Sequence, residues 1–208
     1  PMRRFYFAVS KRFVDIVASV LGLFVLAPLI AGIAVTVRIK LGSPVLFRQV
    51  RPGKDNELFT LYKFRSMKDV DEENGLITNE QRMTVFGCKL RASSLDELPT
   101  LWNVLRGDMS LVGPRPLLVE YLPLYSSTQA RRHEVRPGVT GLAQAKGRNA
   151  LSWDQKFLYD VHYVDNCSFI MDMRILAMTV RQVLKRDGIA SDGYLVGEPF
   201  SPNNEKSR

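Results

Sequence analysis

The chain has 208 residues, a formal net charge of +8 and a pI near 9.7. This length suits one domain with a sizeable core, because two full domains would each be small. The net positive charge indicates an anionic partner. Nucleic acid, lipid headgroups and a phosphorylated substrate all fit this description equally well. Two cysteines and two histidines, without any CxxC spacing, exclude a conventional zinc cluster.

An apolar segment occupies residues 16–37 and carries no charged side chain. Its length is about what roughly 30 Å of hydrocarbon requires of a helix. Basic residues flank both ends of the segment, so the positive-inside rule predicts the cytoplasmic side equally for both ends. Pro28 lies near the middle, where it removes a backbone hydrogen bond and breaks or bends the helix. We therefore predict a re-entrant helix-break-helix anchor, with a kinked spanning helix as the alternative. Asp15, beside Lys11 and Arg12, is expected to be an ion-paired anchor at the membrane boundary.

The remaining elements follow from local patterns. Residues 43–67 predict a β-hairpin around the turn RPGKDNE, and residues 68–82 predict a mobile surface loop. A helix is expected from Leu98 to Leu105, ended by Gly107. Residues 113–135 predict a Pro-rich loop with one or two short helices, and residues 136–149 a Gly-rich loop that approaches a ligand with its backbone. Two helices are predicted at 153–164 and 169–186, with Ser152 and Ser168 as N-caps.

These elements predict an α+β fold that is mostly helical, with a small β-hairpin and an N-terminal re-entrant segment. Aromatic residues interleave with Arg and Lys, a mixture that fits amphipathic helices at a membrane interface and fits core positions equally well; they are Trp102, Tyr121, Tyr125, Trp153 and Tyr159. We expect an anchor at residues 1–40, a catalytic domain at 41–188 and a loose tail at 189–208.

Two adjacent carboxylates, Asp96 and Glu97, lie in the apolar stretch SSLDELPTLWNVL. One carboxylate can act as a nucleophile toward a phosphoryl group while its neighbour helps to hold Mg²⁺. Attack on a diphosphate by an anion also needs fixed cations nearby, and the sequence offers Lys63, Arg65, Arg91, Arg115, Arg136 and Arg148. Taken alone, an Asp-Glu pair at a helix start is commonly a complement to the helix dipole.

Three stretches favour a catalytic role for the pair over a role as a complement to the helix dipole. They are KFRSM, SLDELPTLWNVLRGDMSLVGPRP and RPGVTGLAQAKGRN. Together with the apolar N-terminal segment and its proline, they resemble the bacterial sugar transferase family of monotopic phosphoglycosyl transferases. The resemblance runs from about Lys11 to Gly188. Within the family, PRPLLVEYLPLY and GRNALSW are most similar to the members that transfer N,N'-diacetylbacillosamine 1-phosphate to undecaprenyl phosphate in protein glycosylation.

The resemblance implies a two-step exchange. Asp96 matches the nucleophile that attacks the β-phosphate of a UDP-sugar, expels UMP and carries the sugar phosphate to undecaprenyl phosphate. Glu97 matches the second member of the dyad, for which we expect a part in binding Mg²⁺, with Asp96 as the other carboxylate. The cations Lys63, Arg91, Arg115, Arg148 and Arg136 would hold phosphate or nucleotide. Leu142 and Ala145-Lys146 depart from the pattern of many relatives, which leaves the nucleotide-sugar contacts open.

The same resemblance places the enzyme in the inner (cytoplasmic) membrane with its active site on the cytoplasmic face. The expected partners are then membrane lipids and downstream glycosyltransferases. Nucleic acid is not an expected partner, and the chain could be a monomer or a homodimer.

Two other functions are consistent with the residues alone. A membrane phosphohydrolase would release inorganic phosphate without a lipid acceptor, and a basic membrane-surface scaffold or nucleic-acid binder would bind polyanions in a salt-dependent way without Mg²⁺.

Overall fold

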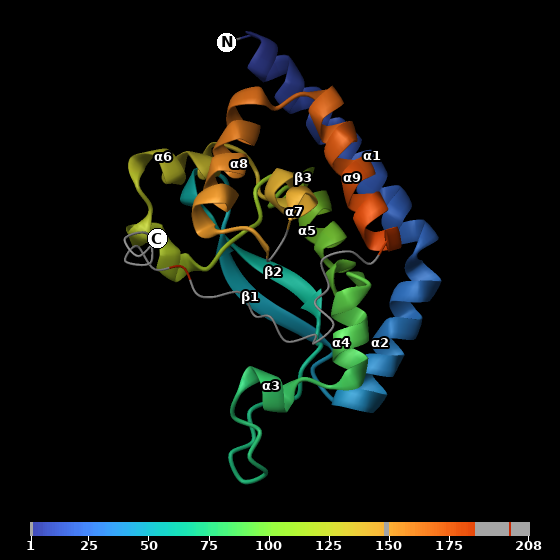
Figure 1. Cartoon of the computed structure of the whole chain (residues 1–208). Helices are drawn as coiled ribbons and strands as arrows, with labels where there is room; N and C mark the ends of the chain where they lie inside the picture. The colour runs from blue at the N-terminus through green and yellow to red at the C-terminus, as the bar shows by residue number, and fades with distance from the viewer. Residues whose placement is uncertain (1, 148–149, 186–199, 201–208) are drawn as a thin grey trace.

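The protein is described here by a computed structural model that covers residues 2–147, 150–185 and 200. Within these ranges the chain is mostly helical and contains a two-stranded antiparallel sheet and a two-stranded parallel sheet (Figure 1). The helices are α1 (Met2–Val25), α2 (Ala27–Leu41), α3 (Asn79–Arg82), α4 (Val85–Ala92), α5 (Thr100–Arg106), α6 (Ser127–Ala130), α7 (Leu142–Lys146), α8 (Trp153–Asn166) and α9 (Phe169–Lys185). The strands are β1 (Leu46–Pro52), β2 (Leu58–Phe64), β3 (Ser110–Val112) and β4 (Gly138–Thr140), and the 3₁₀ turns are η1 (Lys54–Asn56), η2 (Leu95–Glu97), η3 (Val119–Leu124) and η4 (Arg131–Glu134). The mostly helical α+β class is confirmed.

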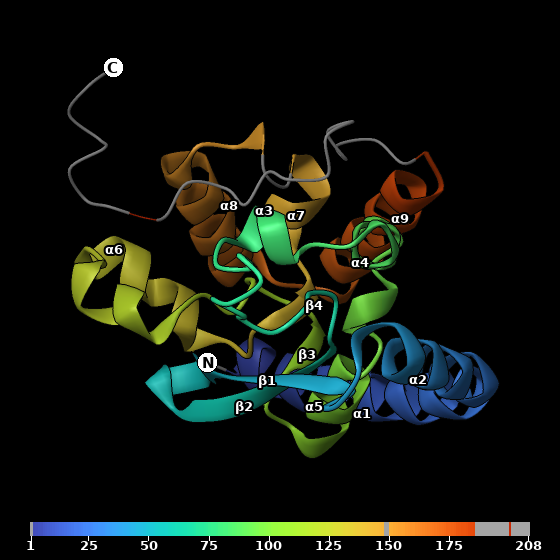
Figure 2. The ribbon, with the colours of Figure 1, turned by 90° about the horizontal axis from the view of Figure 1, so that it is seen from below.

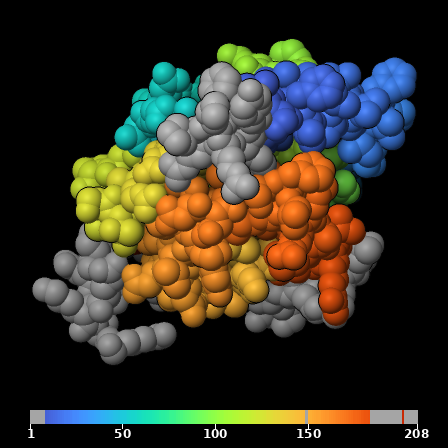
Figure 3. Space-filling view, turned by 90° about the horizontal axis from the view of Figure 1, so that it is seen from above, coloured from blue at the N-terminus to red at the C-terminus, as the bar shows by residue number. Residues whose placement is uncertain are grey.

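Two layers are visible when the molecule is seen from below (Figure 2). One layer contains α1, α2, α5 and the hairpin β1–β2, and the other contains α4, α7, α8 and α9. In the view from above, α8 and α9 fill the centre of the face and the N-terminal helices lie along its edge (Figure 3). The short strands β3 and β4 lie between the two layers, so they join the N-terminal elements to the C-terminal helices.

The N-terminal helix pair bends by 63° between α1 and α2. Pro28 is the second residue of α2, and Leu26 leaves helical geometry with φ −89° and ψ 2°. Pro28 lacks the N–H that a continuous helix would use, which explains the break. Among the described residues no single helix is long and apolar enough to cross a membrane, whereas this bent pair passes the same test as a unit. The predicted break at Pro28 is confirmed.

α1 is fastened to the rest of the protein by polar contacts at its middle. Lys11 Nζ lies 2.5 Å from Asp172 Oδ2 of α9, and Arg12 donates to the carbonyl oxygen of Leu105 at 2.7 Å. Asp15 is 3% exposed and accepts a hydrogen bond from the backbone N–H of Leu111 at 3.0 Å. These partners differ from the ion pairing expected for Asp15, because α1 contacts α5, β3 and α9 at this level. The contacts attach the anchor helix to both layers.

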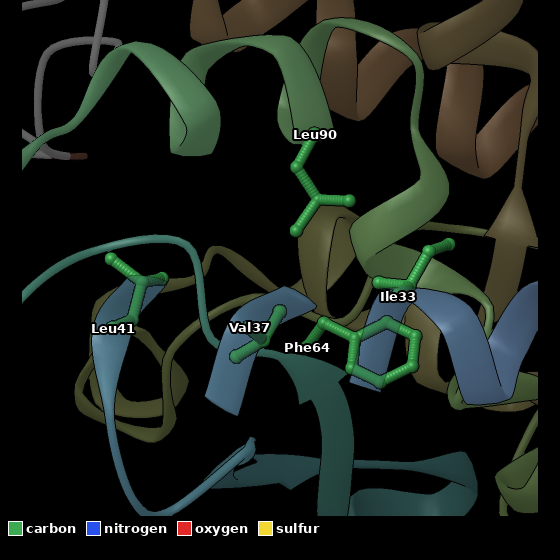
Figure 4. Close-up of a cluster of buried hydrophobic side chains, with 5 residues drawn as sticks. All are labelled: Ile33, Val37, Leu41, Phe64 and Leu90. Atoms are coloured by element: carbon green, nitrogen blue, oxygen red, sulfur yellow. The ribbon is translucent and has the colours of Figure 1, made fainter. Parts of the chain in front are cut away.

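A shared apolar core links α2 to the elements that carry the site. Ile33, Val37 and Leu41 of α2 pack with Phe64 of β2 and Leu90 of α4 (Figure 4). All five side chains are at most 9% exposed. α2 therefore packs directly against β2 and α4.

The predicted hairpin is confirmed: β1 pairs antiparallel with β2, with Leu46 opposite Phe64 and Pro52 opposite Leu58. Asp55 and Asn56 turn the chain with positive φ values of 54° and 63°, a conformation that Asp and Asn tolerate better than most residues. The buried side chain of Asn103 in α5 accepts from the N–H of Tyr62 and donates to the carbonyl oxygen of Thr60. These two hydrogen bonds hold β2 against α5.

Several helix ends follow the expected signals. Gly107 ends α5 with φ 100°, and Ser152 caps α8 in a reciprocal pair with Gln155. The Ser168 hydroxyl accepts from the N–H of Met171 at the start of α9. The prediction of a loop throughout residues 68–82 is wrong at its end, because Thr78 caps α3 and the Gln81 side chain returns to the Thr78 N–H. The capping-box pattern explains this turn of helix.

The Gly-rich stretch at 136–149 was predicted to be a loop that faces a ligand, and this is wrong for most of its described part. Gly138–Thr140 forms β4, which pairs parallel to β3, and α7 follows. The glycines permit a close approach of backbone to backbone instead. A Cβ on Gly138 would lie 2.1 Å from the backbone nitrogen of Gly113, and one on Gly141 would lie 2.2 Å from the Gly113 carbonyl oxygen.

Substitution of Gly138 by alanine should lower the free energy of unfolding by about 3 kcal/mol, because rigid backbone would have to move. Gly32→Ala is the matched control: no atom lies within 4 Å of the added Cβ, and alanine is favoured over glycine in a helix. Thermal unfolding in detergent measures both variants. Equal melting temperatures for the two variants would contradict the packing argument.

Candidate active site

The Asp96–Glu97 pair is held by the leucines on either side of it. Leu95 and Leu98 pack against the core cluster that α2 forms with Phe64 and Leu90. The pair lies in the 3₁₀ turn η2, after Ser94 with φ 56° and just before α5. The sequence predicted a helix that starts at Leu98, directly after the pair, and the structure gives the pair a separate 3₁₀ turn before α5. Burial of the leucines fixes the two carboxylates between the anchor helices and α5.

Glu97 is the centre of a charge cluster drawn from three parts of the chain. Its Oε1 lies 2.6 Å from Lys63 Nζ of β2 and 2.9 Å from a terminal nitrogen of Arg115, in the loop after β3. Burial alone would raise the pKa of Glu97, but Arg115 and Lys63 outweigh it and lower this pKa to about 2. Glu97 is therefore a fixed anion that holds two cations beside Asp96.

Asp96 has the opposite electrostatic setting. Its side chain belongs to a residue that is only 8% exposed. Burial and then the negative charge of Glu97 raise the pKa of Asp96 to about 6, although Lys63, Arg91 and Arg115 oppose the shift. Two neighbouring carboxylates with well-separated pKa values are suited to different roles. Asp96 is the more basic of the two.

This difference predicts a pH profile. In the nucleophilic role expected from the sequence, Asp96 would have to lose its proton before attacking phosphorus, so kcat/KM should rise by about tenfold per pH unit below pH 6 and level off above it. The sign follows from the raised pKa: the proton is retained at acidic pH, and activity appears as pH increases. UMP release measured from about pH 5 to about pH 8 tests this. A profile that is flat below pH 6 would contradict an essential Asp96 carboxylate with a raised pKa.

Arg91 reaches the dyad from α4. Its Nε donates to Ser66 Oγ at 2.9 Å, and its charge acts on Asp96. α4 approaches the backbone at Ser66 closely, because a Cβ on Gly87 would lie 1.8 Å from the Ser66 carbonyl oxygen. Gly87 therefore permits the approach that brings Arg91 to the site. Ser66 belongs to the quoted KFRSM motif, but nothing in the sequence paired it with Arg91.

Two further arginines surround Arg115, and sequence reasoning missed both. Arg51 of β1 donates to the Pro116 carbonyl oxygen at 3.4 Å, and burial followed by the charge of Arg115 lowers its pKa to about 10. Arg132 donates to the Arg115 carbonyl oxygen at 2.6 Å and forms a buried ion pair of 2.8 Å with Asp160 of α8. Local patterns could not reveal either contact, because each partner comes from a distant part of the chain.

The remaining predicted residues lie elsewhere. Arg136 donates to the Gly107 carbonyl oxygen at 2.8 Å, next to the end of α5 that Arg12 also contacts, whereas the dyad precedes the start of α5. The structure thus brings together Lys63, Arg91 and Arg115 with the dyad and leaves Arg136 at the opposite end of the helix. Arg148 lies outside the described residues.

The dyad is compatible with Mg²⁺ in its donor set. Mg²⁺ is commonly bound by one or two carboxylates, with waters and substrate phosphates as the other ligands. Oε1 of Glu97 contacts Lys63 and Arg115, which leaves Oε2 and the Asp96 oxygens as donors. Across residues 2–147 and 150–185 no cluster of three or more acidic, His or Cys side chains could hold a metal ion. A bound ion would therefore depend on the substrate for part of its coordination.

Comparison with known proteins identifies the class of protein to which the chain belongs. Residues 6–186 match the bacterial sugar transferase family, and the chain belongs to that family. It is 51% identical over 200 residues to the uncharacterized sugar transferase EpsL of Bacillus subtilis, covering 96% of this chain and 99% of the relative. It is 39% identical over 191 residues to the UDP-glucose:undecaprenyl-phosphate glucose-1-phosphate transferase of Xanthomonas campestris. It is also 37% identical over 196 residues to the undecaprenyl-phosphate galactose phosphotransferase of Salmonella typhimurium.

The coverage differs among these relatives. The matches to the glucose and galactose transferases each include 86% of this chain, but only 40% and 41% of the relatives' own lengths. This chain therefore spans about two fifths of the longer transferases and nearly all of the Bacillus subtilis relative.

Proposed function

We propose that this protein is a phosphoglycosyl transferase that moves a sugar 1-phosphate from a UDP-sugar to undecaprenyl phosphate and releases UMP. The observation that carries the proposal is the buried Asp96, which lies beside an ion-paired Glu97 within a cluster of Lys63, Arg91 and Arg115. The names of two relatives describe this type of reaction for glucose and galactose. The family resemblance supports N,N'-diacetylbacillosamine as the sugar.

The reaction proceeds in two successive displacements at the same phosphorus. An Asp96 carboxylate oxygen attacks the β-phosphorus of the UDP-sugar, and the bond to the bridging oxygen breaks, so its electron pair leaves with UMP. An oxygen of undecaprenyl phosphate then attacks the same phosphorus and displaces Asp96 as a free carboxylate. Lys63 and Arg115 stabilise the equatorial phosphate oxygens, on which negative charge is concentrated. Mg²⁺, when bound through Asp96 and Glu97, would neutralise diphosphate charge.

A membrane location follows from the lipid acceptor, whose phosphate stays at the headgroup level. The bent pair α1–α2 would enter and leave the bilayer by the same face, because Arg12 precedes the bend and Arg38 and Lys40 follow it. Apolar side chains on this pair are exposed in the protein alone, including Phe24 at 79% and Ile39 at 77%. Leu95 and Leu98 pack against the core cluster to which α2 contributes, which would hold the dyad close to the lipid phosphate. The proposed setting is the cytoplasmic face of the inner membrane.

The test is UMP release by purified protein in detergent with Mg²⁺ and undecaprenyl phosphate. The panel of donors contains UDP-N,N'-diacetylbacillosamine, UDP-N-acetylgalactosamine, UDP-glucose and UDP-galactose. Formation of UMP together with a lipid diphosphate sugar supports the proposal and identifies the donor. Release of sugar phosphate or inorganic phosphate without lipid would instead favour a phosphohydrolase. If none of the donors yields UMP, the proposal is wrong for these sugars.

A further inference from the structure

An aromatic box, defined here as Tyr121, Tyr125, Trp153 and Phe157, encloses a residue from the far end of the chain. The ring centroid of Phe200 lies 5.5 Å from Tyr121, 5.9 Å from Tyr125, 5.4 Å from Trp153 and 5.0 Å from Phe157. Phe200 is 4% exposed, and its backbone N–H donates to the Tyr121 hydroxyl at 3.1 Å. The tail predicted at 189–208 lies outside the described residues except at Phe200, whose side chain is buried.

The aromatic box is connected to the active site through one buried arginine. The guanidinium carbon of Arg132 lies 5.8 Å from the ring centroid of Tyr125 and 5.9 Å from that of Phe157. The same side chain pairs with Asp160 and donates to the carbonyl oxygen of Arg115 at 2.6 Å. Arg132 is 3% exposed, so its orientation depends on the rings that pack against it. Phe200 contacts both of those rings.

We propose that Phe200 docks into the aromatic box and acts as a positioning residue for Arg115. Phe200 holds the Tyr125 and Phe157 rings against Arg132, and Arg132 fixes the backbone of the loop that carries Arg115 and its bond to Glu97. Phe200 touches no reacting atom, so it is a positioning residue. The inference rests on the proposed function, because Arg115 matters to the reaction as a ligand of the donor's phosphates.

Docking is measured first without any activity. The chain has two tryptophans, and Trp102→Phe leaves Trp153 as the reporter inside the box. Adding Phe200→Ala should shift the Trp153 emission to longer wavelength, because water reaches the vacated position. Phe169→Ala is the matched control, since Phe169 is 57% exposed at the start of α9 and has no ring contact with the box among the described contacts. An unchanged emission spectrum in Phe200→Ala would overturn the docking.

Coupling to Arg115 is measured by calorimetric binding of UDP with Mg²⁺, which does not require turnover. Phe200→Ala should weaken UDP binding by about tenfold, whereas in an Arg115→Lys background the same change should weaken it by less than about twofold. Equal fold-changes in the two backgrounds would overturn the positioning role. If Phe200→Ala does not fold, Phe200→Leu keeps most of the apolar volume and should show about a threefold loss that is again confined to wild-type Arg115.

These outcomes separate the inference from the function on which it rests. If UDP binding depends on Phe200 only when Arg115 is present, the positioning role is supported. If the enzyme turns over a UDP-sugar but Phe200→Ala binds UDP normally, the positioning role is wrong and the transferase function stands. If wild-type protein neither binds UDP nor releases UMP from the donor panel, the proposed function and the positioning role both fail, and the Trp153 emission decides only whether Phe200 docks in the aromatic box.

Discussion

Replacement of Asp96 by asparagine should reduce UMP release by at least about 10³-fold, because the amide has no anionic oxygen to form the acyl phosphate. The change preserves size and removes one buried carboxyl group, so the protein should fold. Burial and Glu97 raise the pKa of Asp96 to about 6, which makes its carboxylate a stronger nucleophile than an ordinary aspartate while it remains ionised at neutral pH. Radiolabelled sugar phosphate should remain bound to wild-type protein after denaturation and be absent from the variant.

Asp154→Asn provides the matched control, because Asp154 is exposed in the first turn of α8 and forms part of neither the dyad nor its cation cluster. It should keep full activity. Wild-type activity in Asp96→Asn would show that the attacking group is not Asp96, and the dyad would then be a helix-start feature with another role.

Replacement of Glu97 by glutamine should lower kcat/KM by about 10²-fold at neutral pH. The change removes the anion that Lys63 and Arg115 contact at 2.6 and 2.9 Å, so two cations remain close together without their counter-charge. The negative charge of Glu97 also raises the pKa of Asp96. Without it, the pKa of Asp96 should fall, and the rise of kcat/KM with pH should move to more acidic values. UMP release across the same pH range measures both effects.

Glu57→Gln is the control for this change, because Glu57 is exposed between the hairpin strands. Its rate and pH profile should match those of the wild type. A Glu97→Gln variant with lower activity but an unmoved acidic limb would mean that Glu97 serves only to hold cations or metal, and that its charge does not set the pKa of Asp96.

The two adjacent carboxylates have different electrostatic roles: Glu97 compensates nearby cations, and Asp96 keeps a raised pKa. In the proposed reaction three basic side chains lie near the transferred phosphate, yet three neighbouring cations alone would repel one another and would lower the pKa of Asp96. Glu97 compensates two of them and counteracts that decrease. The leucines at positions 95 and 98 pack against the core cluster that α2 shares with Phe64 and Leu90. The site is therefore built on the element that is proposed to enter the membrane.

Local chemistry was sufficient for several features of the molecule. Proline at position 28 excludes a straight helix, the RPGKDNE turn specifies the hairpin, and Gly107 ends α5. The dyad, with Lys63, Arg91 and Arg115, could also be selected from the sequence, because a long motif carries the resemblance to the family. Each of these signals lies within a few consecutive residues, and for that reason it can be interpreted without knowledge of the fold.

Contacts between distant segments required the tertiary structure. The parallel pair of β3 with β4 depends on the approach of Gly113 to Gly138, and the Gly-rich sequence alone suggested a ligand loop. Arg51 and Arg132 reach Arg115 from other elements, and Phe200 enters its box from the end of the chain. Pairing, burial and pKa depend on which groups meet in space, and distance along the chain does not determine that. Short motifs in the sequence were enough to select the candidate site residues, whereas the folded chain shows which of their charges neutralise one another.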